Sequence, residues 1–286
     1  MKLVRVGPIG AEIPGVLLED GTVVDVSSVT CDFGPAFFAD SDGLRRLREI
    51  VASGAGALPT LATDGVRLGP PIARPHKLLC IGLNYADHAE EANLQIPEEP
   101  ILFAKGTNTI VGPNDTVLLP RTSQKTDWEV ELALIIGKVA RYLPDEASAM
   151  DAIAGYAVSN DVSERAFQIE RGGQWIKGKS CETFNPLGPW IVTRDEIDDP
   201  QKLGMSLSVN GQVMQEGNTA TMIFSPAHIV WYLSQFMVLE PGDVINTGTP
   251  PGVGMGMSPP RFLHTGDVME LEIDGLGQQR QVCAQA

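Results

Sequence analysis

Residues Thr126 to Lys138 read TDWEVELALIIGK, a strand-like run that places Glu129 and Glu131 two positions apart. Successive side chains of a strand point to opposite faces, so these two glutamates share one face. The other face is apolar and consists of Trp128, Val130, Leu132 and Leu134. The carboxylates start about 7 Å apart and repel each other unless a positive group lies between them. One interpretation is a half-exposed strand with solvated glutamates, and the other is a site for a divalent cation.

The composition argues against several classes of protein. The 286 residues carry 21 Lys and Arg against 36 Asp and Glu, a net charge of −15. Such a field repels phosphate, so we expect no nucleic-acid partner and no anionic membrane partner. No apolar run is long enough to span a bilayer, and the N-terminus lacks the apolar segment of a secretory signal. The four cysteines are scattered, which argues against a zinc ribbon or a disulfide framework and favours a reduced, cytoplasmic protein.

Turn residues divide the chain into short segments that are mostly β-like. A proline-rich stretch at residues 69–76 predicts a boundary near residue 72 between a small N-terminal domain, 1–72, and a larger domain, 73–286. Asp20-Gly21 and Asn210-Gly211 each predict a β-hairpin. The predicted fold class is mainly β (α+β) with a few helices.

Two longer helices are expected in the larger domain. One covers about residues 145–154. The other begins at Ser225-Pro226, with Ser as the N-cap and Pro in the first turn, and continues to about Met237.

Asp161 follows a strand that begins near Gly155 and offers a third carboxylate. Together with Glu129 and Glu131 it forms a ligand set of oxygen atoms only, which suits Mg²⁺, Mn²⁺ or Ca²⁺ rather than zinc. The alternative for Asp161 is a turn or capping role.

His88 and Glu91 lie three positions apart in a short segment that is expected to be helical from Asp87 to Asn93. At this spacing the two side chains can touch, and a carboxylate beside an imidazole is the pairing that a general base needs. A surface His–Glu contact without catalytic function is the alternative.

Lys179 belongs to a loop constrained by glycine and proline, where it can neutralise an enolate or a carboxylate. Lys177 is a competing candidate, and a solvated loop lysine is the alternative for both. The glycine-rich residues 247–256 lack the Gly-Lys-Ser/Thr of a P-loop and the context of a dinucleotide site. We interpret them as a tight loop whose backbone and Thr249 hydroxyl line a pocket.

In this order, the segments resemble the fumarylacetoacetate hydrolase family. The similar residues span roughly 77 to 255 and are Asn84-Tyr85-x-x-His88-x-x-Glu91, Pro100-x-x-Phe103-x-Lys105, Glu129-x-Glu131-Leu132, Asn160-Asp161-Val-Ser-x-Arg165, Lys179-Ser180, Asn185-Pro-x-Gly-Pro189 and Gly248-Thr-Pro-x-Gly-Val-Gly254. The resemblance implies a β-rich roll of mixed sheets, a small variable N-terminal domain and assembly as a homodimer.

The resemblance also implies roles for individual residues. It makes Glu129, Glu131 and Asp161 the ligands of Mg²⁺ or Mn²⁺, and His88 with Glu91 the group that activates water. Lys179 would stabilise developing negative charge. The positions that would contact the substrate are Arg165, Gln168 and Thr249.

The implied reaction is hydrolysis of the C3–C4 bond of a 2,4-diketo acid. Within the family, residues 173–189 are most similar to bacterial hydrolases of 2,4-diketo-3-deoxy-L-rhamnonate or its L-fuconate analogue, which release pyruvate and lactate. The alternatives on the same scaffold are oxaloacetate decarboxylation, keto–enol isomerisation and ureidoglycolate lyase activity. A further alternative is a metal-stabilised binding protein without catalysis.

Overall fold

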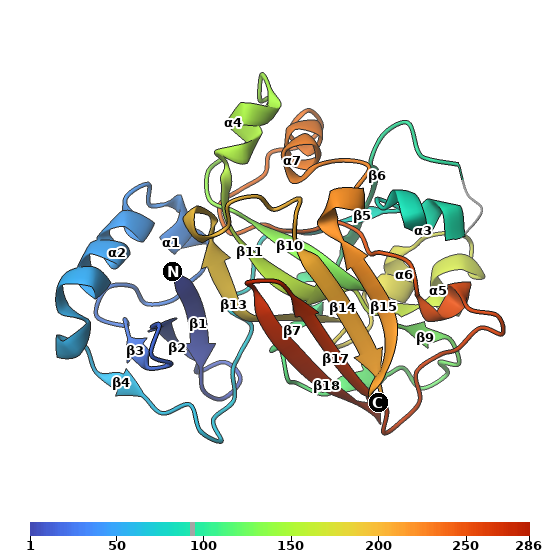
Figure 1. The fold of residues 1–286 in the computed structure, drawn as a ribbon, viewed down its shortest axis with the longest axis horizontal. Helices are drawn as coiled ribbons and strands as arrows, with labels where there is room; N and C mark the ends of the chain where they lie inside the picture. Colours follow the sequence, from blue (N-terminus) through green and yellow to red (C-terminus); the bar gives the residue numbers. More distant parts are fainter. Residues whose placement is uncertain (92–94) are drawn as a thin grey trace.

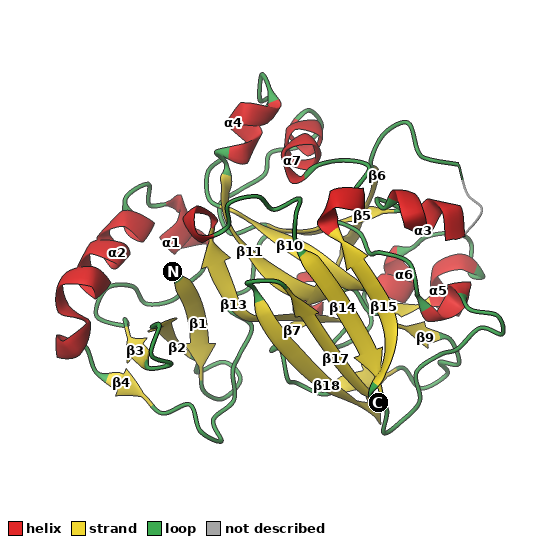
Figure 2. Cartoon of the chain, in the orientation of Figure 1, coloured by secondary structure: helices red, strands yellow, loops and turns green. Residues whose placement is uncertain are grey.

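The fold is mostly β with a few helices (Figures 1 and 2), as predicted from the sequence. The structure is a computed structural model that describes residues 1–91 and 95–286. Two sheets face each other, with helices at their ends and a smaller N-terminal unit on one side (Figure 1).

The large sheet has eleven strands, in the order β4-β3-β2-β1-β13-β11-β10-β16-β5-β6, with β7 paired to β13. β10 lies near its middle, antiparallel to both β11 and β16. The strands that form the part of this sheet outside the N-terminal unit are β5 (Leu78–Gly82), β6 (Ile101–Lys105), β7 (Ile110–Val111), β10 (Val130–Ile136), β11 (Ile153–Asn160), β13 (Asn185–Thr193) and β16 (Val244–Asn246).

All residues of β10 are buried, because both faces of this strand are covered. Leu132 and Leu134 pack toward the second sheet in one core cluster. Ala133 and Ile135 point the other way and pack in the cluster that includes the N-terminal helices. Glu131 continues the row of Ala133 and Ile135, so the alternation of the strand carries a carboxylate into the interior.

The second sheet has five strands in the order β15-β14-β17-β18-β8. Asn210 and Gly211 form the predicted hairpin between β14 and β15, with φ of 53° and 75°. Both angles are positive, as in the type I′ turn that suits two-residue hairpins. The strands of this second sheet are β8 (Val117–Leu119), β14 (Gly204–Val209), β15 (Gln212–Asn218), β17 (Val268–Ile273) and β18 (Gly277–Gln285).

The N-terminal unit contributes four strands and two helices. Its hairpin turns at Asp20-Gly21, as predicted, and pairs Leu17 with Val23. β1 pairs with β13, so these strands extend the large sheet. The division at residue 72 stays a prediction. The elements of the unit are β1 (Lys2–Val6), β2 (Ile13–Leu17), β3 (Val23–Asp25), β4 (Thr60–Leu61), α1 (Pro35–Ala39) and α2 (Gly43–Gly54).

The remaining helices are short. α4 (Glu146–Met150) is shorter than predicted, because Ile153 already pairs with Ile136 and the strand takes the end of the predicted helix. α7 (Pro226–Ser234) begins as predicted, since the Ser225 hydroxyl accepts a hydrogen bond from the His228 amide at 2.9 Å, but it ends before Met237. The others are α3 (Ala86–Glu91), α5 (Arg165–Ile169) and α6 (Ile176–Lys179). The end of the helix predicted at 87–93 lies outside the described residues.

Among the described residues, no helix is long and apolar enough to cross a membrane.

Candidate active site

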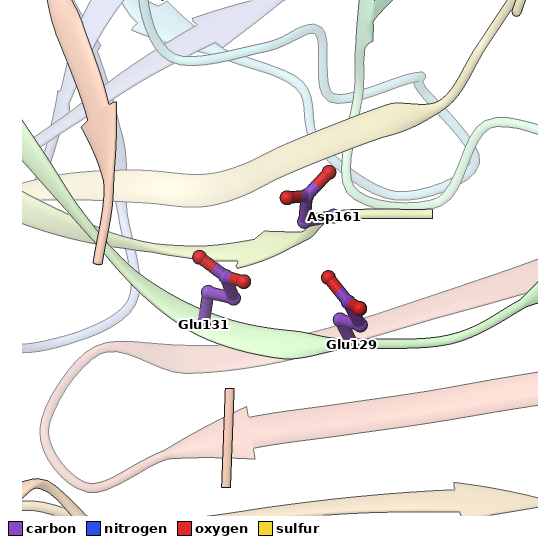
Figure 3. Close-up of side chains that lie close together, drawn as sticks. All are labelled: Glu129, Glu131 and Asp161. Carbon is purple, nitrogen blue, oxygen red and sulfur yellow. The ribbon is translucent and has the colours of Figure 1, made fainter. Parts of the chain in front are cut away.

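Three buried carboxylates meet where β10 begins and β11 ends. Glu131 is on β10, Glu129 directly precedes the strand, and Asp161 directly follows β11. The antiparallel register pairs Val130 with Asn160, which places Asp161 opposite Glu129. One oxygen from each carboxylate lies within 4.8 Å of the others. Figure 3 shows the two glutamates side by side on one segment and Asp161 across from them. The structure therefore brings together the three predicted ligands, although Glu129 lies just outside the strand.

Cationic side chains surround two of the three carboxylates. Lys179 Nζ lies 2.6 Å from Glu129 Oε2 and 2.9 Å from Asp161 Oδ2. Arg165 Nη1 lies 2.7 Å from Glu129 Oε1, and Lys105 donates to Asp161 Oδ1. All three cations are buried. Lys179 is thus part of the cluster, whereas Lys177 is exposed and donates to a backbone carbonyl.

Lys105 is a site residue that the sequence reasoning did not select. It ends β6, and its ammonium group also donates to the Val162 carbonyl at 3.1 Å and the Phe184 carbonyl at 2.7 Å. A lysine at the end of an apolar strand was the available signal, because lysine is almost never fully buried unless it is paired.

The pKa values of the two glutamates are shifted in opposite directions. Burial opposes ionisation of Glu129, but Lys179 and Arg165 outweigh it and lower its pKa to about 2. Burial raises the pKa of Glu131 well above its usual value, and the charges of Asp161 and Glu129 raise it further. The Gly248 amide donates to Glu131 at 2.7 Å, and no described Lys or Arg forms an ion pair with this carboxylate. Glu131 is therefore the member of the cluster that lacks a cation.

This donor set fits a divalent cation that prefers oxygen ligands, such as Mg²⁺ or Mn²⁺. An ionised carboxylate has about four acceptor positions, so the contacts of Lys179 and Arg165 leave capacity for a metal. A cation beside Glu131 would compensate the carboxylate that the protein itself leaves unpaired. The residues that would hold it are Glu129, Glu131 and Asp161.

The predicted His–Glu pair forms on α3. His88 Nδ1 lies 3.2 Å from Glu91 Oε2, which confirms the contact expected from their spacing. The Gly252 amide donates to both oxygens of Glu91, at 3.1 and 3.2 Å. The pair is thus fixed against the glycine-rich loop, and its catalytic role stays a prediction.

Arg165 and Gln168 lie together on α5, both buried. Arg165 Nη1 donates to Gln168 Oε1 at 3.2 Å, so both belong to the surroundings of Glu129. Their contact with substrate stays a prediction.

Thr249 lies against the backbone of Val130, between the two glutamates. Its hydroxyl donates to the Val130 carbonyl at 2.9 Å and accepts from Gln215 Nε2 at 2.8 Å. Gln215 also accepts from the Val130 amide at 3.0 Å, so this side chain, which the sequence reasoning missed, fixes the start of β10.

The glycine-rich loop binds the protein's own carboxylates through its backbone amides. Gly248 binds Glu131, Gly252 binds Glu91, and Gly254 binds Asp127 at 2.7 Å. Backbone amides of such loops commonly bind phosphates, and here they bind three carboxylates from two other segments, α3 and the run that contains Asp127 and Glu131. Asp127 is a third residue that the sequence reasoning did not select.

Buried carboxylates with shifted pKa values, clustered with cations, are typical of an enzyme active site. The chain belongs to the fumarylacetoacetate hydrolase family: the family model described as "Fumarylacetoacetate (FAA) hydrolase C-terminal" matches residues 77–283. This assignment confirms the family resemblance inferred from the sequence.

Known proteins of both hydrolase and isomerase type are similar to the chain. A Burkholderia ambifaria relative, whose provisional name states only the class hydrolase, is 53% identical over 282 residues, 98% of each chain. The maleylpyruvate hydrolase of Sphingobium sp. SYK-6, solved with manganese(II) and pyruvate, is 28% identical, with a TM-score of 0.83 over 100% of both chains. The 5-carboxymethyl-2-hydroxymuconate delta-isomerase of Mycobacterium smegmatis is 31% identical, with a TM-score of 0.78 over 100% of this chain and 99% of that one.

Proposed function

We propose that this protein is a divalent-metal-dependent hydrolase that cleaves the C3–C4 bond of an acylpyruvate, a 2,4-diketo acid. The observation that carries the proposal is the buried cluster of Glu129, Glu131 and Asp161, flanked by Lys179 and Arg165. The manganese and pyruvate in the similar maleylpyruvate hydrolase support the same class of metal and product. Mg²⁺ is the proposed native metal, and Mn²⁺ is an alternative.

The residues of the chain divide the reaction between them. Bound at the carboxylates, the metal would supply a Lewis acid for the carboxylate and 2-keto oxygens of the substrate. His88, with Glu91 accepting at Nδ1, removes a proton from the water that attacks the C4 carbonyl. The electron pair of the C3–C4 bond then moves to the pyruvyl fragment as an enolate. Lys179 stabilises that negative charge, and protonation at C3 gives pyruvate beside the carboxylic acid formed from C4.

The fixed cations also explain why so acidic a protein can take an anionic substrate. Arg165 and Lys179 are buried and ionised: burial disfavours the cation of each, but Glu129 and a second carboxylate outweigh it and raise both pKa values. Their charge is concentrated at the site, while the net charge of −15 is distributed over the whole chain. The two cations offset the charges of the buried carboxylates, and a divalent cation bound there would make the local field attract the carboxylate of a substrate.

The proposal is tested by pyruvate release from a panel of 2,4-diketo acids, with Mg²⁺, with Mn²⁺ and with EDTA. Within this class we propose 2,4-diketo-3-deoxy-L-rhamnonate or the L-fuconate analogue as substrate, because residues 173–189 resemble hydrolases of these acids. We expect metal-dependent release of equal amounts of pyruvate and a second acid. If no member of the panel releases pyruvate, the hydrolase proposal is wrong.

The variant H88A tests the attack by water. We expect turnover to fall by about 100-fold to 10,000-fold, the usual contribution of general base catalysis. H264A is the matched control, since His264 also lies three positions from an acidic residue, with its Nδ1 3.8 Å from Asp267, but its side chain is 83% exposed. Near-normal turnover of H88A would contradict the role of His88.

A second candidate is keto–enol or double-bond isomerisation, which is favoured by the similar Mycobacterium smegmatis isomerase. Isomerisation and oxaloacetate decarboxylation need the metal and enolate stabilisation but no attacking water. In either case E131Q would abolish activity while H88A kept most of it. Oxaloacetate and ureidoglycolate in the panel, read by carbon dioxide and glyoxylate release, separate decarboxylation and lyase activity from hydrolysis. Isomerisation is recognised by conversion of a substrate without release of pyruvate.

The homodimer and the cytoplasmic location expected from the sequence stay predictions.

A further inference from the structure

Asp127 is a completely buried carboxylate whose acceptor positions are filled by groups from different segments. Its Oδ2 accepts from Arg165 Nε at 2.8 Å and from the Met255 amide at 3.0 Å. Its Oδ1 accepts from the Gly254 amide at 2.7 Å and from the Trp128 amide at 2.9 Å. A buried carboxylate with this many donors is held firmly and holds its donors in turn.

These contacts join the two halves of the site. On one side, Arg165 binds both Asp127 and Glu129, and its Nη1 lies 2.7 Å from Glu129 Oε1. On the other side, the turn that Asp127 binds begins at Gly252, whose amide donates to Glu91. The Trp128 indole donates to the Gly252 carbonyl at 3.1 Å and fixes the same turn from the next position. Asp127 therefore lies between the carboxylate cluster and the His88–Glu91 pair.

The glycines of the turn permit this approach. A Cβ on Gly254 would lie 2.0 Å from the Arg261 carbonyl oxygen and 2.8 Å from Asp127 Oδ1. Gly252 has a φ of +99°, and a Cβ there would lie 1.9 Å from the Met214 carbonyl oxygen. The turn thus has little room to shift relative to Asp127 and to the Met214 and Arg261 carbonyl groups.

We propose that Asp127 is a positioning residue that holds the turn 252–255 in the place where the Gly252 amide binds Glu91. Through Glu91 it sets the position of His88 relative to the carboxylate cluster. The inference rests on the proposed function, because it assigns to His88 and Glu91 the activation of water.

The test compares D127N with D115N. Asn keeps the size of Asp127 but replaces one acceptor by an NH₂ donor, which then faces either Arg165 or the loop amides. Asp115 is the matched control: it also binds an arginine, Arg67, at 2.6 and 2.7 Å and a backbone amide, Gly112, at 2.6 Å, but belongs to the junction with the N-terminal unit. We expect kcat of D127N to fall by about 100-fold, as for a small misplacement of a catalytic group, with KM little changed. D115N should retain wild-type kinetics.

Two measurements that do not depend on turnover report on the turn and on the metal ligands separately: hydrogen exchange and Mn²⁺ binding. Hydrogen exchange of the peptide that covers 252–255 should become about fivefold faster in D127N for each hydrogen bond lost, and should be unchanged in D115N. The dissociation constant for Mn²⁺ should change by less than about tenfold in D127N, because Lys179, Lys105 and Gly248 still hold the three ligands. Unchanged exchange in D127N, or loss of Mn²⁺ binding in parallel with kcat, would overturn the proposal.

A double-mutant cycle with Glu91 separates positioning from general destabilisation. If Asp127 acts through Glu91, D127N/E91Q should be slower than E91Q by no more than about threefold. If the double variant loses turnover by the product of the losses in D127N and in E91Q, the two residues act independently. This result would overturn the positioning role and leave the proposed function intact. If E91Q alone has wild-type turnover, Glu91 does not assist His88, and both the proposed His88–Glu91 base and this inference are wrong.

G254A is the second variant if D127N does not fold. Its methyl group would lie 2.0 Å from the Arg261 carbonyl oxygen and 2.8 Å from Asp127 Oδ1, so it moves the turn away from Asp127 without changing the carboxylate. Circular dichroism confirms folding, and the same slow turnover, faster exchange and non-additivity with E91Q are expected. A folded G254A with wild-type kcat would contradict the proposal.

Discussion

The pattern Glu-x-Glu occurs on two strands of this protein with opposite results. Glu129 and Glu131 at β10 are buried, whereas Glu270 and Glu272 on β17 are exposed. Both pairs alternate with buried apolar residues, so the local pattern is the same. On β17 the glutamate face is solvated. Glu270 forms an ion pair with Arg280, whose Nε lies 3.6 Å from Glu270 Oε1, and both side chains are half-exposed. On β10 the same face is covered by Lys179 and Arg165, each within 3 Å of Glu129.

A Glu-x-Glu strand therefore becomes a candidate metal site only when charged side chains of other segments pack over its glutamate face. The half-exposed strand with solvated glutamates, which was one interpretation for Glu129 and Glu131, is what the structure shows at β17. β10 lies inside the large sheet, and the chain after β11 returns over its glutamate face with Arg165 and Lys179. β17 is covered by the other sheet on its apolar face only. Three pairs of variants use this comparison.

The largest effect is expected from E131Q against E272Q. E131Q removes the charge of one of the three proposed metal ligands, so turnover should fall by about 1000-fold, together with binding of Mn²⁺. E272Q removes a solvated carboxylate and should change turnover by less than about twofold. The measurement is metal-dependent turnover with Mn²⁺ titration. Equal behaviour of the two variants would show that burial does not distinguish the pairs.

The next effect concerns the cations, with K179M against R280M and EDTA present. Without Lys179, Glu129 and Asp161 lose the partner they share, and an uncompensated buried charge lowers the free energy of unfolding by about 3–5 kcal/mol. Loss of the exposed Arg280–Glu270 pair should cost less than about 1 kcal/mol. Urea denaturation measures both. A K179M variant as stable as R280M would mean that Lys179 does not stabilise the cluster.

The smallest effect is the pH dependence of stability in EDTA, for E129Q against E270Q. The pKa of Glu129 is lowered from 4.5 to about 2, so its stabilising contribution is complete above pH 4.5 and is lost as the pH falls through 2. Over this range the wild-type protein should lose about 3 kcal/mol from this group, an upper value. E129Q should lack this decline and E270Q should retain it. A decline in E129Q as steep as in the wild type would refute the assignment to Glu129.

Short-range patterns in the sequence predicted short-range structure. The hairpins at Asp20-Gly21 and Asn210-Gly211, the Ser225 cap and the His88–Glu91 contact all form as expected. Each depends on residues a few positions apart, where turn geometry or helix spacing decides the contact. The predicted end of the helix at 145–154 was wrong, because a long-range contact decides it: pairing of Ile153 with β10 outweighs the local helical preference.

The candidate site could be predicted in part. A resemblance to a family selected the three carboxylates and Lys179, but Lys105, Asp127 and Gln215 were not selected. Lys105 had a local signal, a lysine at the end of an apolar strand, but the partners lie far apart in the sequence: Lys105 contacts Asp161 56 positions away, and Gln215 contacts Val130 85 positions away. Their roles depend on which segments the sheets bring together.

By itself, the sequence determined that Glu129 and Glu131 face the same way and that His88 can touch Glu91, because strand and helix periodicity act over a few residues. The tertiary structure buries this glutamate pair and leaves the pair on β17 exposed. It also decided that Lys179 binds Glu129 and Asp161, and that a loop 117 positions after Glu131 binds it through a backbone amide. The physical reason is that burial and charge compensation depend on long-range packing, which the same local pattern can receive or lack.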